Sequence, residues 1–121
     1  GGSMSNSAEL EISEILPFEK GFRVNISGPI NIYSAGQLTN AIIKKTTDGM
    51  KLAVDLSKVP MVDSSGIGFL IRLARDLEKK KGKVILCGVT DDFKSNLTAL
   101  RVDKLVRLAS SAATIPADFW Q

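Results

Sequence analysis

The chain has 121 residues, of which 44% are hydrophobic and 24% are charged. This length and composition predict one globular domain, and no run of about 18 apolar residues is present that could cross a membrane. The sequence contains no histidine and a single cysteine, Cys87. These counts exclude Ser-His-Asp and Cys-His catalysis, zinc sites built from histidine and an internal disulfide, and they favour a reducing compartment.

The two ends of the chain and its charge say little about partners. We interpret residues 1–3, ahead of Met4, as the remnant of a cleavage site used in expression, and residues 4–121 as one domain with its core at about 10–108. No secretory signal follows Met4, so we expect a cytoplasmic protein. The net charge is +3, and six basic residues against two acidic ones lie between Arg72 and Lys83. We expect that run to be a solvated helix end and not a nucleic-acid surface, because no aromatic residue is interleaved with it.

The amino-terminal part of the chain predicts an antiparallel hairpin. Apolar and polar residues alternate from Leu10 to Leu16, and Pro17 is expected to end this strand. After a turn at Gly21, Phe22–Ile26 alternates cleanly and predicts a second, half-buried strand. Gly28–Pro29 ends it.

The middle of the chain predicts a helix followed by a buried strand. Ile30–Tyr33 is expected to be an extended bridge, and Ser34 is a plausible N-cap for a helix that reaches about Lys45. Asp48–Gly49 ends this helix. The mostly apolar run Leu52–Leu56 is typical of a strand that is buried on both faces.

The remaining elements alternate between helices and strands. We expect a long helix from Ser64 to Lys81 that stops at Gly82, a strand at 84–87 with Cys87 buried, a helix capped by Asp91 or Asp92 that runs to Leu100, a short strand at 105–108, and an irregular or helical tail at 109–121. The order β-β-α-β-α-β-α-β predicts an α/β fold with a mixed sheet, in which helices packed mainly on one face connect parallel strands.

The long helix has one apolar face and one misfit. At 100° per residue, one apolar stripe of the helix faces the sheet. The stripe comprises Ile67, Leu70, Ile71, Leu73, Ala74 and Leu77. The polar residues Arg72, Arg75, Asp76 and Lys79 lie opposite. Phe69 falls among these polar residues, so it is expected either to cover the edge of the core or to be an exposed contact for a partner.

The start of this helix is the place where chemistry is expected. Ser64 and Ser65 lie where free backbone N–H groups and the positive end of the helix dipole are exposed. Simple N-capping by the Asp-Ser-Ser-Gly sequence is the plain interpretation. A serine nucleophile is not expected, because no histidine base exists and the sequence is not Gly-x-Ser-x-Gly. A phosphate-binding loop is not expected either, because no Gly-x-x-x-x-Gly-Lys-Ser/Thr sequence is present.

The stretch from Leu52 to Leu70 resembles a known family. It reads Leu-Ala-Val-Asp-Leu-Ser-Lys-Val-Pro-Met-Val-Asp-Ser-Ser-Gly-Ile-Gly-Phe-Leu. This is similar to the strand, loop and Asp-Ser-Ser/Thr-Gly-[Ile/Leu]-Gly helix start of the STAS-domain family of bacterial anti-sigma factor antagonists. Segments 28–38 and 84–88 also resemble the family, so the resemblance covers roughly residues 10–108.

The resemblance implies a phosphorylation switch. It makes Ser64 the phosphoacceptor, with Ser65 as the alternative, and an anti-sigma factor that is also a serine kinase the partner. The unphosphorylated form binds this partner and releases the sigma factor, the phosphorylated form does not bind, and a PP2C-type phosphatase resets the switch. Asp63 shapes the environment of the acceptor, while Gly66 and Gly68 allow the kinase to approach.

The resemblance also implies the contact residues and the cofactors. The residues expected to contact the partner are Asn31, Tyr33, Ser34, Asp63, Ser65, Gly66, Ile67, Gly68 and Phe69. At Asn31 the family often has an acidic residue, so the usual polar contact with the kinase is in doubt. No cofactor is expected in this chain, since ATP and Mg²⁺ belong to the partner kinase. The chain itself is expected to be a regulator and not an enzyme, and a monomer or a weak homodimer.

A second interpretation within the same family is an accessory or scaffold module. Such modules serve as subunits of ABC lipid transporters, as stressosome-like scaffolds or as regulatory domains derived from transporters. Length does not exclude the accessory subunit. A neighbouring gene for a serine kinase or PP2C-type phosphatase favours the antagonist, whereas an ABC transporter operon favours the accessory subunit.

Overall fold

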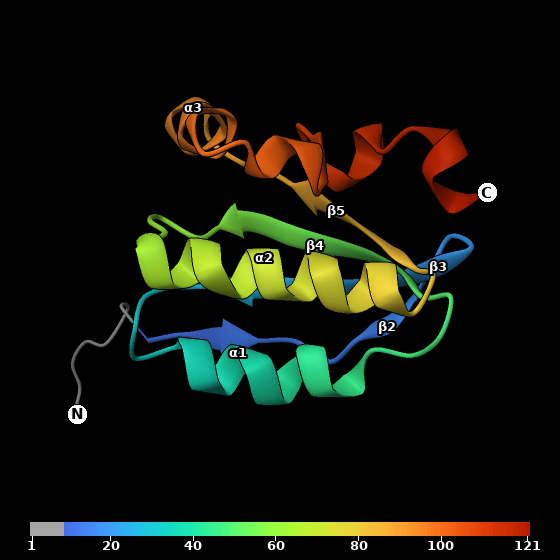
Figure 1. Ribbon diagram of the computed structural model, residues 1–121, viewed down its shortest axis with the longest axis horizontal. Coiled ribbons are helices and arrows are strands. Elements are labelled where there is room, and N and C mark those ends of the chain that lie inside the picture. Colours follow the sequence, from blue (N-terminus) through green and yellow to red (C-terminus); the bar gives the residue numbers. More distant parts are fainter. Residues whose placement is uncertain (1–8) are drawn as a thin grey trace.

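The computed structural model describes residues 9–121, which form one six-stranded mixed sheet with helices packed against it (Figure 1). The strands lie in the order β1-β3-β4-β5-β6, and β2 also pairs with β3. The elements are β1 (Glu11–Ile12), β2 (Leu16–Phe18), β3 (Gly21–Ser27), α1 (Ala35–Ala41), β4 (Lys51–Lys58), α2 (Ser64–Lys79), β5 (Lys83–Cys87), α3 (Asp91–Ala99) and β6 (Arg107–Ala109), with 3-10 helices at Ile43–Lys45, Val102–Lys104, Ala112–Thr114 and Ala117–Trp120. The pairs β3–β4, β4–β5 and β5–β6 are parallel, while β1 and β2 run antiparallel to β3. The predicted α/β class is confirmed; the interpretation of residues 1–3 lies outside the described residues.

The first predicted strand is two strands. The Ser13 hydroxyl accepts a hydrogen bond from the Asn25 backbone N–H at 2.8 Å, and the Ser13 N–H donates to the Asn25 carbonyl at 2.9 Å. The chain then leaves β3 and returns as β2, in which Pro17 pairs with Phe22. The prediction that Pro17 ends the strand is therefore wrong. A proline is tolerated here because β2 is an edge strand and its missing N–H is not needed for pairing.

Alternation along the strands divides the sheet into two faces. Val24, Leu52, Val54 and Leu86 belong to the main core, where they pack with the apolar faces of the helices. The helices α1 and α2 lie side by side over this face (Figure 1). Residues of the opposite parity, including Ala53, form a second, smaller cluster on the other face. The expectation that helices cover mainly one face is confirmed.

Helix α2 carries the predicted apolar stripe, but Phe69 belongs to it. The Phe69 side chain is only 2% exposed and packs in the main core. Asp76, which we expected in solvent, accepts a hydrogen bond from the buried Thr46 hydroxyl and pairs with Lys80 at 3.3 Å. Lys80 also donates to Thr46 Oγ1 at 2.7 Å. These contacts attach the carboxyl-terminal half of α2 to the segment that precedes β4.

The helix ends differ from prediction because nearby side chains compete for the cap. Ser34 makes no capping hydrogen bond to α1. Thr90, and not Asp91 or Asp92, caps α3 by accepting from the Phe93 N–H at 3.1 Å. Helix α2 ends at Lys79, and Lys81 takes the left-handed conformation with φ of 63°.

The carboxyl-terminal tail covers part of the second face of the sheet. Phe119 is fully buried and Trp120 is 6% exposed, and they pack with Ala53, Ile85 and Cys87. The tail was expected to be irregular or helical, and two 3-10 helices shape it. Neighbouring cations hold it in place: Lys51 Nζ donates to the Trp120 carbonyl at 2.7 Å, Lys83 lies over the Phe119 ring, and Arg107 pairs with Asp118.

Removing the aromatic anchor of the tail is expected to destabilise the protein strongly. Phe119→Ala should lower the free energy of unfolding by about 3–5 kcal/mol, because a fully buried aromatic ring leaves a cavity. Burial and the neighbouring Asp55 charge raise the pKa of the Cys87 thiol to about 11, so Cys87 should be unreactive in the native protein and reactive in the variant. Urea unfolding and a thiol reagent at neutral pH measure both effects. Tyr33→Ala, at an aromatic side chain that is 93% exposed, is the control; an unreactive Cys87 in a fully stable Phe119→Ala protein would contradict the packing described here.

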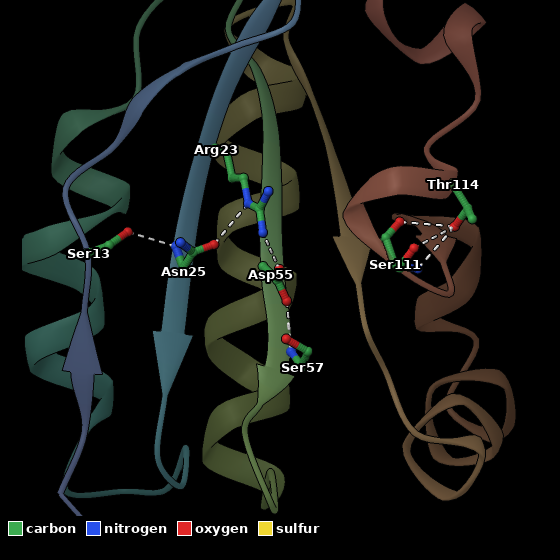
Figure 2. Close-up of polar contacts among 7 residues, drawn as sticks. All are labelled: Ser13, Arg23, Asn25, Asp55, Ser57, Ser111 and Thr114. Atoms are coloured by element: carbon green, nitrogen blue, oxygen red, sulfur yellow. Dashed lines mark hydrogen bonds and ion pairs between the residues drawn. The ribbon is translucent and has the colours of Figure 1, made fainter.

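Beside the tail, the second face carries a polar network (Figure 2). Arg23 Nη2 donates to Asp55 Oδ2 at 2.6 Å, and Arg23 Nε donates to Asn25 Oδ1 at 2.9 Å. The Ser57 N–H donates to the other Asp55 oxygen at 2.9 Å. Arg23 also lies over the Phe18 ring, 5.1 Å from its centroid. The Asp55 side chain is 13% exposed, so its charge is partly desolvated and depends on these donors.

This network predicts an acid-sensitive contribution to stability. Burial raises the pKa of Asp55, but the hydrogen bonds from Ser57 and Arg23 outweigh it and hold the pKa below its usual value. A lowered folded-state pKa adds stability above the unfolded-state pKa of about 4, and this stability is lost as the pH falls through the folded-state value. The difference in unfolding free energy between the native protein and Asp55→Asn should therefore shrink on acidification below about pH 4. Urea titrations at several pH values check this; a difference that is constant with pH would contradict it.

Candidate functional site

The N-terminus of α2 presents one serine to solvent. Asp63 is the N-cap, and its Oδ1 accepts a hydrogen bond from the Gly66 N–H at 3.1 Å. Ser64 is the first residue of the helix and is exposed, whereas Ser65 is half-buried. Among residues 9–121, no partner forms a hydrogen bond with the Ser64 hydroxyl. The plain N-capping role therefore belongs to Asp63, and Ser64 is left free for chemistry.

Two loops meet beside this serine. The Ile30 N–H donates to the Met61 carbonyl at 3.0 Å, and the Asp63 N–H donates to the Ile30 carbonyl at 3.1 Å. Ile30 and Val62 form an isolated parallel bridge. These contacts extend the pairing of β3 with β4 beyond the sheet, so the loop before α1 is held against the loop that leads into α2.

Both loops place large apolar side chains in solvent. Ile32 is 66% exposed, Tyr33 is 93% exposed and Met61 is 57% exposed. Together with Ser64 and Gly68, they form what we call the α2 N-terminal surface. Clustered exposed apolar groups mark interaction sites more often than scattered ones do. Tyr33 was predicted as a contact residue from the sequence, whereas Ile32 and Met61 were not, although both stand in loop segments rich in apolar residues.

Asn31 and Ser34 shape the loop before α1, and Ser34 lies beneath its surface. Asn31 Oδ1 accepts from the Tyr33 N–H at 2.9 Å, which turns the chain outward. Ser34 is 5% exposed, and its hydroxyl accepts from the Asn31 N–H at 2.7 Å and donates to the Asn31 carbonyl at 3.0 Å. The expectation of an extended bridge up to Tyr33 is therefore wrong. Ser34 is buried, so we correct its assignment from partner contact to loop structure.

The two glycines of the helix start have different surroundings. A Cβ atom on Gly66 would lie 2.5 Å from Val62 Cγ1 and 2.9 Å from the Ile30 carbonyl, whereas one on Gly68 would meet nothing within 4 Å. Gly66 is buried and lets α2 pack on the bridged loops, so it does not open the surface to a partner. Gly68 lies four residues after Ser64 and on the same face of the helix. Of the two glycines, it is the one with open space beside it.

Two further residues that were expected to contact a partner are core residues. Ile67 is 9% exposed and Phe69 is 2% exposed, and both pack in the main cluster. We therefore correct their assignment to the core. The core-edge alternative for Phe69 is the one the packing supports.

The chemistry open to this surface is binding and modification. Within residues 9–121 there is no group of three acidic, cysteine or histidine side chains arranged to hold a metal ion. In the same part of the chain, no helix has the length and apolarity that a membrane crossing requires. The free Ser64 hydroxyl sits at the positive end of a helix dipole, a position that tolerates an added phosphate.

Comparisons with known proteins agree with this geometry. A sequence relative named anti-sigma-B factor antagonist, from Bacillus subtilis, is 31% identical over 68 residues, which is 56% of this chain and 62% of the relative. The chain spans 59–62% of the length of the Listeria and Bacillus relatives and 68% of the length of the Staphylococcus aureus ones. A crystal structure of an anti-sigma factor antagonist from Mycobacterium paratuberculosis superposes with a TM-score of 0.72 at 22% identity, over 91% of this chain and 93% of that one.

The same fold also occurs in another class of protein. The crystal structure of a sulfate transporter family protein from Wolinella succinogenes superposes with a TM-score of 0.69 at 19% identity, over 83% of this chain and 84% of that one. These structural similarities show that the fold is shared and nothing more. The sequence model of the STAS domain family matches residues 16–115. The chain therefore belongs to the STAS domain family.

Proposed function

We propose that this protein is an anti-sigma factor antagonist whose binding to its partner is switched off by phosphorylation of Ser64. The observation that carries the proposal is the free, exposed Ser64 hydroxyl beside the exposed apolar residues Ile32, Tyr33 and Met61. The sequence relatives named anti-sigma-B factor antagonist support it. The partner is an anti-sigma factor that is also a serine kinase, and a PP2C-type phosphatase restores the binding form.

The switch works through electrostatics at the interface. A phosphate adds a charge of roughly −1.5 to −2. In the free protein, the start of α2 and solvent accommodate this charge. In the complex, the same group must be desolvated against the partner, which costs several kcal/mol when it is unpaired. The switch therefore requires no refolding of the domain.

In this proposal the chain supplies a surface and the partner supplies the reaction. ATP and Mg²⁺ belong to the kinase, and the antagonist holds no cofactor of its own. Ser64 is favoured over Ser65 as the acceptor because Ser64 is exposed and Ser65 is half-buried. A partner that regulates bacterial transcription places the complex in the cytoplasm.

A second candidate function is that of an accessory or regulatory module of a transporter. The likeness to the sulfate transporter family protein favours it, because that protein shares the fold at a TM-score of 0.69. In that case Ile32, Tyr33 and Met61 contact a transporter subunit, and Ser64 is only a solvated helix residue.

Affinity capture separates the two candidates. Ser64→Ala and Ser64→Asp proteins serve as bait in lysate of the source organism, and mass spectrometry identifies the captured proteins. Capture of a serine kinase of the anti-sigma type by the Ala form and not by the Asp form supports the antagonist. Equal capture of transporter subunits by both forms would overturn the phosphorylation switch and favour the accessory module.

A further inference from the structure

The second face of the sheet, opposite α1 and α2, contains a hollow that the proposed function does not use. Among residues 9–121, the tail covers the part of this face around Ala53 and Ile85. Over β1, β3 and β4, no residue of the described part of the chain covers this face, and a hollow of about 470 Å³ forms there, a volume typical of sites for small molecules. We call it the sheet hollow; its polar lining includes Ser13, Arg23, Asn25, Ser27, Asp55 and Lys58.

The Asp55 carboxylate in the sheet hollow already accepts a hydrogen bond at each of its oxygens. Asp55 Oδ2 accepts from Arg23 at 2.6 Å, and Asp55 Oδ1 accepts from the Ser57 N–H at 2.9 Å (Figure 2). The Arg23 guanidinium balances its charge at this distance. The Asp55 oxygens therefore offer little to a ligand, and they hold Arg23 in a fixed position on the floor of the hollow.

Arg23, Asn25 and Lys58 offer free donors to the hollow, while Glu11, which also lines it, contributes a carboxylate. Arg23 donates a hydrogen bond from Nε to Asn25 and another from Nη2 to Asp55. Within residues 9–121, its Nη1 has no hydrogen-bond acceptor. In the same residues, no acceptor meets the Asn25 side-chain N–H groups or Lys58 Nζ. Because three donors lie around one hollow and two of them belong to cationic side chains, the complementary ligand is rich in acceptors and negatively charged.

We propose that the sheet hollow binds a small ligand that bears an oxyanion, either a carboxylate or a phosphate. Arg23 presents its remaining N–H groups to the oxyanion in a planar fork, and Lys58 adds a second positive charge, which counters that of Glu11. Asn25, which the guanidinium orients, adds a neutral donor. The site lies on the open face of the sheet, whereas the α2 N-terminal surface lies at the ends of the helices, so this proposal does not depend on the antagonist function.

Glu11 makes it possible to test the negative charge of the proposed ligand. It lines the same hollow, and β-pairing places it opposite Ser27, which in turn pairs with Lys58. A bound oxyanion is repelled by Glu11 and attracted by Lys58. Neutralising these two residues should therefore change the affinity in opposite directions.

The test is a titration of the full chain, followed by the backbone amide signals in NMR, with citrate and inorganic phosphate as separate probes. We expect saturable shifts at Asn25, Ser27 and Ser57. Lys58→Gln should weaken binding about threefold to fivefold, and Glu11→Gln should strengthen binding by a similar factor. This factor corresponds to the free energy of one exposed charge–charge contact. Arg23→Lys, which keeps a cation beside Asp55, should weaken binding about tenfold, since it loses the fork.

Lys81→Gln, at an exposed lysine outside the hollow, is the matched control and should leave the affinity unchanged. Saturation by citrate alone assigns a carboxylate ligand, and saturation by phosphate alone assigns a phosphate ligand. The absence of saturable shifts with both probes would overturn the proposal. Shifts confined to Lys79–Lys81, or equal effects of Lys58→Gln and Lys81→Gln, would also overturn it, because they indicate general attraction to a basic surface.

Discussion

Ser64→Asp is expected to weaken binding to the anti-sigma partner by more than about a hundredfold, while Ser64→Ala binds at least as well as the native protein. A loss of about 3 kcal/mol is enough for this change, and desolvating one unpaired carboxylate in an interface reaches that size. The Ser64 hydroxyl has no hydrogen-bond partner among residues 9–121, so the Ala form loses no contact within the domain. Surface plasmon resonance or calorimetry with the captured partner measures the ratio.

The expected loss belongs to the interface and not to the fold. A carboxylate in the first turn of a helix interacts favourably with the dipole, by about 0.3–1 kcal/mol, so Ser64→Asp should melt no lower than the native protein. Ser95→Asp is the matched control, because Ser95 is an exposed serine in another helix, α3. If Ser64→Asp and Ser95→Asp bound the partner equally well, the proposed switch would be excluded at this position.

Alanine at the two glycines of α2 is expected to change stability in opposite directions. Gly66→Ala should lower the free energy of unfolding by about 1–3 kcal/mol, because its Cβ would collide with the Ile30 carbonyl, which cannot move as a side chain can. The clash distances are 2.9 Å to that oxygen and 2.5 Å to Val62 Cγ1. Gly68→Ala should raise the free energy of unfolding by about 0.5–1 kcal/mol, since alanine favours the helix and the Cβ would meet nothing within 4 Å.

The same pair of variants tests why a glycine stands at position 68. Under the proposed function, Gly68 leaves room for the partner, so Gly68→Ala should be more stable than the native protein and yet bind the partner more weakly. Gly36→Ala is a control, because Gly36 also has no neighbour within 4 Å of a Cβ, and it lies in α1. Urea unfolding and partner binding are measured on all three proteins. Unchanged binding by Gly68→Ala would show that this glycine leaves no room that the partner needs.

The fold class and the position of the site could be predicted from the sequence alone. Alternating apolar residues in the strands, the apolar stripe of α2 and the order of elements predicted the mixed sheet with helices mainly on one face. These patterns depend on local periodicity, which the chain expresses without help from distant residues. The segment from Leu52 to Leu70 also placed Asp63 and Ser64 at a helix start, and the structure begins α2 at Ser64.

The roles of individual residues depended on contacts that the periodicity of the sequence does not encode. Phe69 was predicted among polar residues, but it lies in the main core, because the surface that covers it is formed by other elements. Ser34 was predicted as a cap, yet its hydroxyl bonds the Asn31 backbone instead, since several acceptors and donors compete in the same turn. A helical wheel gives no information on the packing of Phe69 or on the hydrogen bonds of Ser34.

Three features were decided by tertiary structure alone. The tail reaches the sheet only because Phe119 and Trp120 find an apolar patch on a face whose other half is polar. The exposure of Ile32 and Met61 follows from the pairing of two loops that lie some 30 residues apart in the sequence. The sheet hollow exists because Arg23 and Asp55, 32 residues apart, face each other across adjacent strands. Local patterns determine which elements form, whereas burial and the pairing of polar groups are properties of the space between elements.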